Sequence, residues 1–150
     1  MSLLFPYKIA FLNRAAVSLG GRSSRPRPLL ISSVIGPHGT DAVEGRLDTG
    51  SDETLFSARL AARIGVDLRN APLGQITAAD GSVVSIRYAQ VTLQITDGKE
   101  RREWPAWVGF SAAIRRPLFG FAGFLQFFTA TFHGDRELVE LTINRLYPGI

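Results

Sequence analysis

The chain has 150 residues, 45% of them hydrophobic, and carries a formal net charge of +4 at pH 7. This length suits one packed domain and is too short for two large ones. The absence of cysteine excludes disulfides and thiolate metal sites. The two histidines, His38 and His133, stand far apart in the chain and lack the spacing of metal ligands. We therefore expect neither a metal nor a cofactor.

The positive charge comes almost entirely from arginine, since Lys8 and Lys99 are the only lysines. The arginines are scattered, with small clusters within 22–27, 101–102 and 115–116. Proteins that bind single-stranded nucleic acid combine a basic groove with interleaved aromatic side chains, and no such stripe appears here. The charge therefore indicates a solvated surface, and we expect no nucleic-acid partner.

Two apolar runs resemble membrane or targeting segments in composition. Near the N-terminus, Lys8 interrupts the apolar residues before the apolar region of a secretory signal is complete. The run over residues 117–132 contains glycine and glutamine and is too short to cross a bilayer. We therefore expect a soluble, cytoplasmic protein with no membrane partner.

The first residues of the chain differ from the rest in composition. Two glycines and two prolines fall within residues 20–28, which disfavours a helix or a central strand there. Residues 1–26 are therefore predicted to be a partly flexible N-terminal extension, and residues 27–150 to be the domain proper.

The domain is predicted to consist of short strands separated by turns. The expected strands cover residues 29–35, 42–47, 75–78, 83–88, 90–96, 103–110, 128–132 and 138–143. Helical spacing of apolar side chains predicts a helix over 53–64, with Ser51 or Asp52 as its N-cap and Gly65 ending it in the left-handed conformation. A second short helix is expected around 122–127. The class is mostly β.

The most informative residues follow the second strand and read Leu47-Asp48-Thr49-Gly50-Ser51. They place a carboxylate at a tight turn that contains glycine, behind an apolar residue and beside two hydroxyl side chains. Short motifs of this kind occur by chance, so their order among other features matters.

Four features occur in the order typical of retropepsin-like aspartic proteases, and the chain resembles that family from about residue 27 to residue 143. They are Arg27-Pro28-Leu29-Leu30 at the start of the first strand, Asp48-Thr49-Gly50-Ser51, the hairpin turn at Asp80-Gly81, and Leu118-Phe119-Gly120. The resemblance implies a closed or partly open β-barrel with one or two short helices, assembled as a homodimer.

The resemblance implies a catalytic role for Asp48, Thr49, Gly50 and Ser51. Two carboxylates held close together share one proton, which lets one act as base and the other as acid. The chain contains a single Asp-Thr-Gly, so the second carboxylate would come from the Asp48 of a second copy. Thr49 would donate its hydroxyl across the two-fold axis, Gly50 would leave room for substrate, and Ser51 would hydrogen-bond the ionised carboxylate.

The resemblance also implies residues that bind the substrate, which would be a peptide or an unfolded protein. Asp52 would accept main-chain amides of a bound peptide. Ala79, Asp80 and Gly81 would form the tip of a mobile flap, although a plain exposed hairpin uses the same Asp-Gly pair. Leu118 would belong to a strand that passes beneath the catalytic turn.

The side chains expected to line the substrate pocket are apolar. They are Leu47, Val83, Val84 and Leu118, and they predict a preference for apolar residues on either side of the cut bond.

One position departs from the pattern of viral members, which usually follow the second motif's glycine with arginine. Here Phe121 occupies that place. The salt-bridge support of Asp52 would then need another source, and Arg27 of the second protomer is a candidate.

Two further functions are alternatives to an aspartic endopeptidase. A dimer of the same fold that binds peptides with little or no turnover is compatible with the sequence, because a fold and even an intact site do not guarantee turnover. A phosphate-binding loop of the sugar-kinase or actin type also uses Asp, Gly and Ser or Thr after a strand, but those folds need far more than 150 residues.

Overall fold

The computed structural model describes residues 1–150, and strands dominate it. The strands are β1 (Leu3–Pro6), β2 (Lys8–Ala16), β3 (Arg22–Arg27), β4 (Leu29–Gly36), β5 (Gly39–Leu47), β6 (Leu55–Ser57), β7 (Leu73–Thr77), β8 (Val83–Thr96), β9 (Arg101–Ser111), β10 (Leu118–Phe119), β11 (Phe128–His133) and β12 (Leu138–Ile143). One α-helix, α1 (Ala58–Ile64), and two 3-10 turns, η1 (Val17–Leu19) and η2 (Leu125–Phe127), complete the chain. The mostly β class is confirmed.

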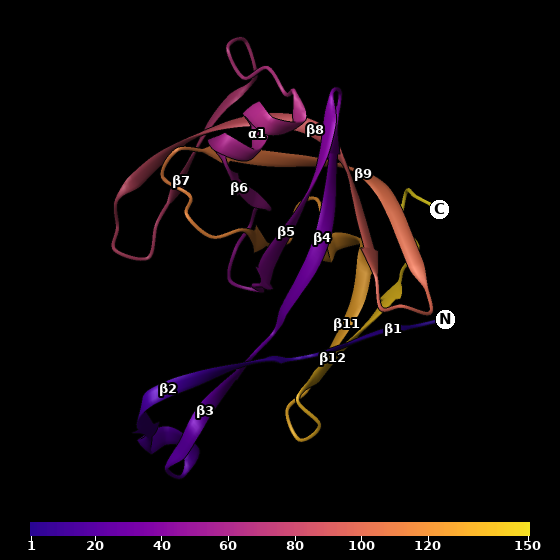
Figure 1. Ribbon diagram of the computed structural model, residues 1–150. Coiled ribbons are helices and arrows are strands. Elements are labelled where there is room, and N and C mark those ends of the chain that lie inside the picture. Colours follow the sequence, from indigo (N-terminus) through magenta and orange to yellow (C-terminus); the bar gives the residue numbers. More distant parts are fainter.

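Six of these strands close into a barrel (Figure 1). They follow one another in the order β4-β5-β10-β6-β9-β8, and an additional pairing of β4 with β8 closes the ring. Strand β7 pairs with β8 outside this ring. A closed barrel leaves few strand edges unpaired, which protects the chain from edge-to-edge association. The closed barrel expected from the sequence is confirmed, while the homodimer stays a prediction.

Aromatic side chains from β9, β10 and the segment after β10 form a cluster within the core. Trp104 and Phe124 are fully buried and meet edge to face with ring centroids 5.2 Å apart. Phe119 stacks on Phe124 at 4.7 Å. Because rings packed in these geometries bury large areas and add pairwise attraction, this cluster fixes β9 against the β10 region.

The helix predicted over residues 53–64 is only partly correct. Leu55–Ser57 form strand β6, and α1 begins at Ala58. Leu55 and Phe56 are buried, with β10 on one side of the strand and β9 on the other. Their burial in the barrel outweighs the helical spacing, so the N-cap is Ser57 and neither of the two residues predicted.

Gly65 ends α1 in the left-handed conformation, as predicted, with φ of 78°. A Cβ at this position would lie 2.7 Å from the His38 side chain. Gly98 has φ of 91° but no atom near its Cβ position. Alanine substitutions at the two glycines therefore distinguish two contributions to the loss of stability. Gly98 reports the left-handed backbone conformation alone, and Gly65 reports the same conformation together with a close contact.

Gly98→Ala is expected to lower the free energy of unfolding by about 1–2 kcal/mol, the usual cost of a left-handed L-residue. Gly65→Ala is expected to cost about 1 kcal/mol more, because His38 must also move. Urea denaturation of both variants measures the difference. Equal losses would show that His38 yields without cost.

Two further expectations differ from the structure. The strands predicted over 83–88 and 90–96 are one continuous strand, β8, which pairs with β9 along most of its length. The helix expected around 122–127 is reduced to the 3-10 turn η2. The closing hairpin of β11 and β12 forms as predicted, with Phe128 opposite Ile143.

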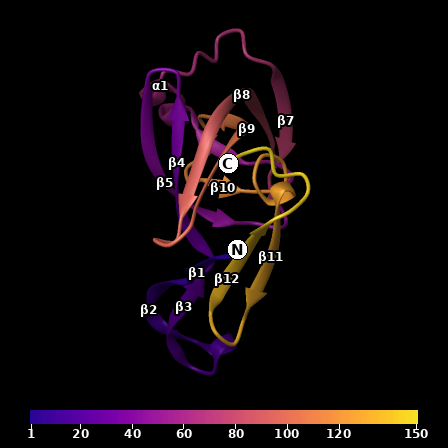
Figure 2. The same cartoon turned by 90° about the vertical axis from the view of Figure 1, so that its right-hand side faces the viewer.

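Residues 1–26, assigned to an extension, form three strands. Strand β1 pairs with β12, and these two lie beside β11 below the barrel (Figure 2). Strands β2 and β3 form a hairpin apart from the barrel (Figure 1). Pro26 is accommodated because β3 pairs with β2 alone.

A bidentate ion pair connects this hairpin to the turn between β11 and β12. The Arg22 guanidinium donates to both carboxylate oxygens of Glu137, at 2.7 and 3.1 Å. The hydrogen bond from Arg22 lowers the pKa of Glu137 below its usual value. Such a pair orients the hairpin more than it adds stability, since both side chains remain partly accessible to water.

None of the helices has the length and apolar character that crossing a membrane requires.

Candidate active site

The residues predicted to be catalytic lie on a loop that passes over strand β10. Strand β5 ends at Leu47 and β6 begins at Leu55, and β10 lies between these two strands. Residues 48–54, here called the motif loop, therefore connect two strands that are not neighbours. Strand β10 runs parallel to β5, with Phe119 beside Leu47, and antiparallel to β6.

Three hydrogen bonds hold Asp48 in place. Its backbone N–H donates to the Phe119 carbonyl at 3.0 Å, and its own carbonyl accepts the Ser51 N–H at 3.2 Å. Its carboxylate Oδ1 accepts the Gly50 N–H at 2.9 Å. The side chain is half-buried. Asp48 is thus a carboxylate of defined orientation that remains accessible to a ligand.

The other motif residues divide into exposed and inward-facing positions. Thr49 and Gly50 are exposed, and Ser51 is half-buried. The Ser51 hydroxyl donates to the Glu53 carbonyl at 2.7 Å. A hydroxyl has one proton to donate. The expected donation from Ser51 to the carboxylate of Asp48 is therefore absent in this chain, and Ser51 shapes the motif loop instead.

Gly120 allows the backbones of two segments to approach each other closely. A Cβ at this position would overlap the carbonyl oxygens of Glu53 and Ser51. The next two residues donate their backbone N–H groups to the motif loop, Phe121 to Ser51 and Ala122 to Asp52, each at 2.9 Å. The segment after β10 therefore supports the motif loop by direct backbone contact.

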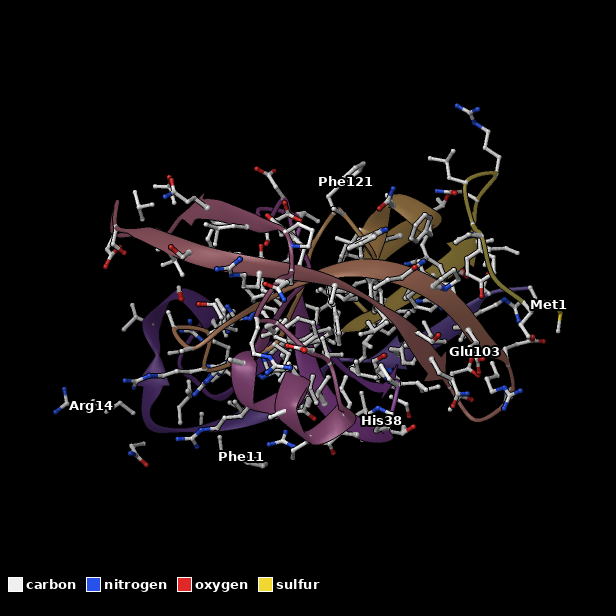
Figure 3. The ribbon with its side chains drawn as sticks, turned by 90° about the horizontal axis from the view of Figure 1, so that it is seen from above. Met1, Phe11, Arg14, His38, Glu103 and Phe121 are labelled. Atoms are coloured by element: carbon white, nitrogen blue, oxygen red, sulfur yellow. The ribbon has the colours of Figure 1, made fainter.

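Asp52 is exposed and its carboxylate forms no ion pair within the chain. Phe121, the residue after Gly120, is 59% exposed and projects from the surface (Figure 3). Phe121 consequently offers Asp52 no charge, and a pair between Asp52 and Arg27 of a second copy stays a prediction.

The predicted flap is the hairpin of β7 and β8. Its turn is closed by hydrogen bonds from Ala78 N–H to the Ser82 carbonyl and from Gly81 N–H to the Ala78 carbonyl, at 2.8 and 2.9 Å. The Asp80 carboxylate accepts the Ser82 hydroxyl at 2.6 Å, and this bond lowers the pKa of Asp80. Ala79, Asp80 and Gly81 are exposed, and no hydrogen bond joins them to the motif loop. A flap role for this hairpin stays a prediction.

The prediction of an apolar substrate pocket is wrong for one of its residues. Leu47 is only 4% exposed and belongs to the barrel core. Side chains alternate between the two faces of a strand, so Leu47 must face opposite to Arg46 and Asp48. Leu118 is half-buried, with Arg46 as its neighbour on β5.

Instead, the structure contains a cavity of about 450 Å³ next to Arg46, two residues before Asp48, that the sequence did not predict. Its walls are Arg27, Leu29, Glu44, Arg46, Arg116, Pro117 and Leu118. These residues come from segments far apart in the sequence, so the cavity could not be predicted without knowing which strands are neighbours.

The structure places no group of three or more histidine, aspartate or glutamate side chains where they could hold a metal ion.

Comparisons with known proteins support the fold. No protein-family model and no curated protein matches the sequence. A solved structure described as a retropepsin-like aspartic protease from Rickettsia conorii matches with a TM-score of 0.50 and 18% sequence identity. The match covers 94% of this chain and 98% of that one. The chain therefore has a retropepsin-like fold.

Proposed function

We propose that this protein is an aspartic endopeptidase whose catalytic dyad consists of Asp48 from each of two copies. The observation that carries the proposal is the geometry of Asp48. Its carboxylate is oriented by the Gly50 N–H, 2.9 Å away, on a loop that a retropepsin-like fold presents at the end of β5. A half-buried carboxylate on a rigid support suits general acid–base chemistry.

The chemistry requires no metal and no covalent intermediate. Two carboxylates at close range cannot both ionise comfortably, so one keeps a proton. The ionised member takes a proton from a water molecule, whose oxygen attacks the carbonyl carbon of the peptide bond, while the protonated member gives its proton to the carbonyl oxygen. The dyad then returns a proton to the amide nitrogen as the C–N bond breaks, which releases the amine and the carboxylic acid. The two pKa values then belong to the pair.

A second copy is needed because each chain provides one Asp-Thr-Gly. Thr49 and Gly50 are exposed in the single chain, so the motif loop is accessible to a symmetric partner. In a two-fold dimer the same patch meets itself, which brings the two Asp48 side chains together. Thr49 would then donate its hydroxyl to the partner's backbone.

The substrate would be an extended segment of peptide or unfolded protein. It would lie as a strand between the Asp48 pair and the β7–β8 hairpin, with Ala79, Asp80 and Gly81 contacting its backbone. Extended recognition of this kind uses main-chain hydrogen bonds for affinity and side-chain pockets for specificity.

Asp48→Asn is expected to reduce cleavage of an unfolded protein to about one-thousandth or less of the wild-type rate, because acid–base catalysis contributes on this order. The assay covers about pH 3.5 to 7, the range in which a shared-proton dyad acts. Sedimentation confirms that the variant dimerises like the wild type. Asp135→Asn, an exposed carboxylate in the β11–β12 turn, is the matched control and should cleave normally.

Two outcomes would contradict the proposal. Cleavage by Asp48→Asn at the wild-type rate would show that another residue, or a contaminant, does the chemistry. If the wild type dimerises but cleaves nothing, the alternative of a dimer that binds peptides without turnover is favoured.

A further inference from the structure

Three neighbouring strands present one continuous face beside Asp48. In the registers of β4 with β5 and of β5 with β10, Arg46 lies between Leu29 and Leu118. Residues two apart on a strand share a face. Glu44 therefore lies on the same face as Arg46, and Asp48 follows Arg46 on that face toward the motif loop.

Two more arginines reach the cavity from the segments that lead into β4 and β10. Arg27 is the last residue of β3, two residues before Leu29, and Arg116 lies in the bend before β10, two residues before Leu118. Both side chains line the cavity together with Arg46, although the three arginines come from segments far apart in the sequence. The cavity wall thus combines three arginines and Glu44 with Leu29, Leu118 and Pro117.

The charges of this cavity are not balanced within the chain. None of Arg27, Arg46 and Arg116 forms a salt bridge. Glu44 is the single carboxylate in the wall, and it faces Lys8 at 4.0 Å. Guanidinium groups bind carboxylates through paired, charge-assisted hydrogen bonds. The cavity is consequently suited to an anionic group.

The position of the cavity determines what can carry that group. Alternate residues of a strand lie about 7 Å apart, so Arg46 is one such step from Asp48. An extended peptide has the same spacing between alternate side chains. A peptide bound with its scissile bond at Asp48 therefore places a nearby side chain over the cavity.

We propose that this cavity is a specificity site that binds the carboxylate of a glutamate or aspartate close to the cut bond. The inference rests on the proposed function, since a peptide is its ligand. Arg46 and Arg116 bind the carboxylate, and Leu29 and Leu118 pack against its methylene groups. This preference replaces the apolar one expected from the sequence.

Binding is measured first, in the Asp48→Asn protein, so that turnover is not required. The probes are short fluorescein-labelled peptides of alanine and valine that carry a single Glu, Gln or Lys at the same central position. The Glu peptide is expected to bind about tenfold more tightly than the Gln peptide, a typical value for a charge-assisted contact. The Lys peptide should bind more weakly still. Added salt should reduce the preference.

Arg46→Gln and Arg116→Gln, each made in the Asp48→Asn protein, are expected to remove the preference for Glu. They lie on different segments, so a folding defect in one does not decide the result, and circular dichroism checks both. Arg101→Gln is the matched control, because Arg101 is exposed and outside the cavity wall. Equal binding of the Glu and Gln peptides would overturn the assignment.

Cleavage by the wild type separates this inference from the proposed function. Cut sites in an unfolded protein should be enriched in Glu or Asp at one fixed position, and the enrichment should disappear in Arg46→Gln. Cleavage without any acidic preference would overturn the inference and leave the endopeptidase standing. Selective binding of the Glu peptide without any cleavage would support the cavity and contradict the endopeptidase.

Discussion

Gly120→Ala is expected to lower the free energy of unfolding by about 3 kcal/mol or more, toward the upper end for overpacked sites. The same substitution is expected to abolish cleavage. The added Cβ would overlap two carbonyl oxygens, those of Glu53 and Ser51. Both are backbone atoms, so neither can move aside by a change of rotamer.

Cleavage is expected to be lost because the backbone on either side of Gly120 holds the motif loop in place. Asp48 receives its support from the Phe119 carbonyl, which belongs to the residue before Gly120. The Phe121 N–H, on the other side of Gly120, donates to the Ser51 carbonyl. A shift of β10 or of the motif loop therefore moves the Asp48 carboxylate. A displacement of about 1 Å can lower the rate of cleavage 100-fold.

Urea denaturation and the unfolded-protein cleavage assay measure the two effects. Gly134→Ala is the matched control, because its Cβ position has no atom within 4 Å. Its effect on stability is expected to stay within about 0.5 kcal/mol, as for most surface substitutions. An unchanged denaturation midpoint for Gly120→Ala, with normal cleavage, would show that the loop accommodates a methyl group.

Trp104→Ala is expected to lower the free energy of unfolding by about 3–5 kcal/mol, the usual range for removing a buried aromatic ring. Trp104 is 1% exposed, and its ring meets Phe124 and Phe128 edge to face, each at 5.2 Å. Its indole N–H donates to the Gly123 carbonyl at 2.9 Å. The substitution would therefore leave both a cavity and a buried carbonyl without its donor.

Thermal unfolding followed by circular dichroism gives the measurement, with an expected fall in Tm of about 10 °C for a chain of this size. Trp107→Ala is the control on the same strand, because Trp107 is 55% exposed. It is expected to lower Tm by no more than about 2 °C. Equal losses for the two tryptophans would contradict the assignment of Trp104 to the core.

The local sequence pattern was sufficient to predict several of the strands. Strand alternation and turn residues predicted β4, β5 and the β11–β12 hairpin near their observed bounds. The pattern was insufficient at residues 53–57, where helical spacing continued across a buried strand. Leu55 and Phe56 are extended because they pair and are buried between β10 and β9. These neighbouring strands come together only in the folded chain.

The Asp48 motif was recognisable from sequence alone because its information is local. A carboxylate, a hydroxyl and a glycine in consecutive positions form a turn whose Gly50 N–H reaches the Asp48 side chain. That interaction spans two residues and needs no distant partner. The position of Ser51 is also local, yet its hydroxyl was assigned to the wrong acceptor because the sequence does not show how the loop curves.

The arginine-lined cavity could be found only in the tertiary structure. Arg27, Arg46 and Arg116 appear in the sequence as scattered surface charges, and their separation gives no hint of a shared wall. Strand register determines which side chains become neighbours, and it depends on pairing between segments far apart in the chain. The residues of the motif loop were thus specified by local sequence, whereas the meeting of Arg27, Arg46 and Arg116 in one cavity wall was decided by how distant segments of the chain pair.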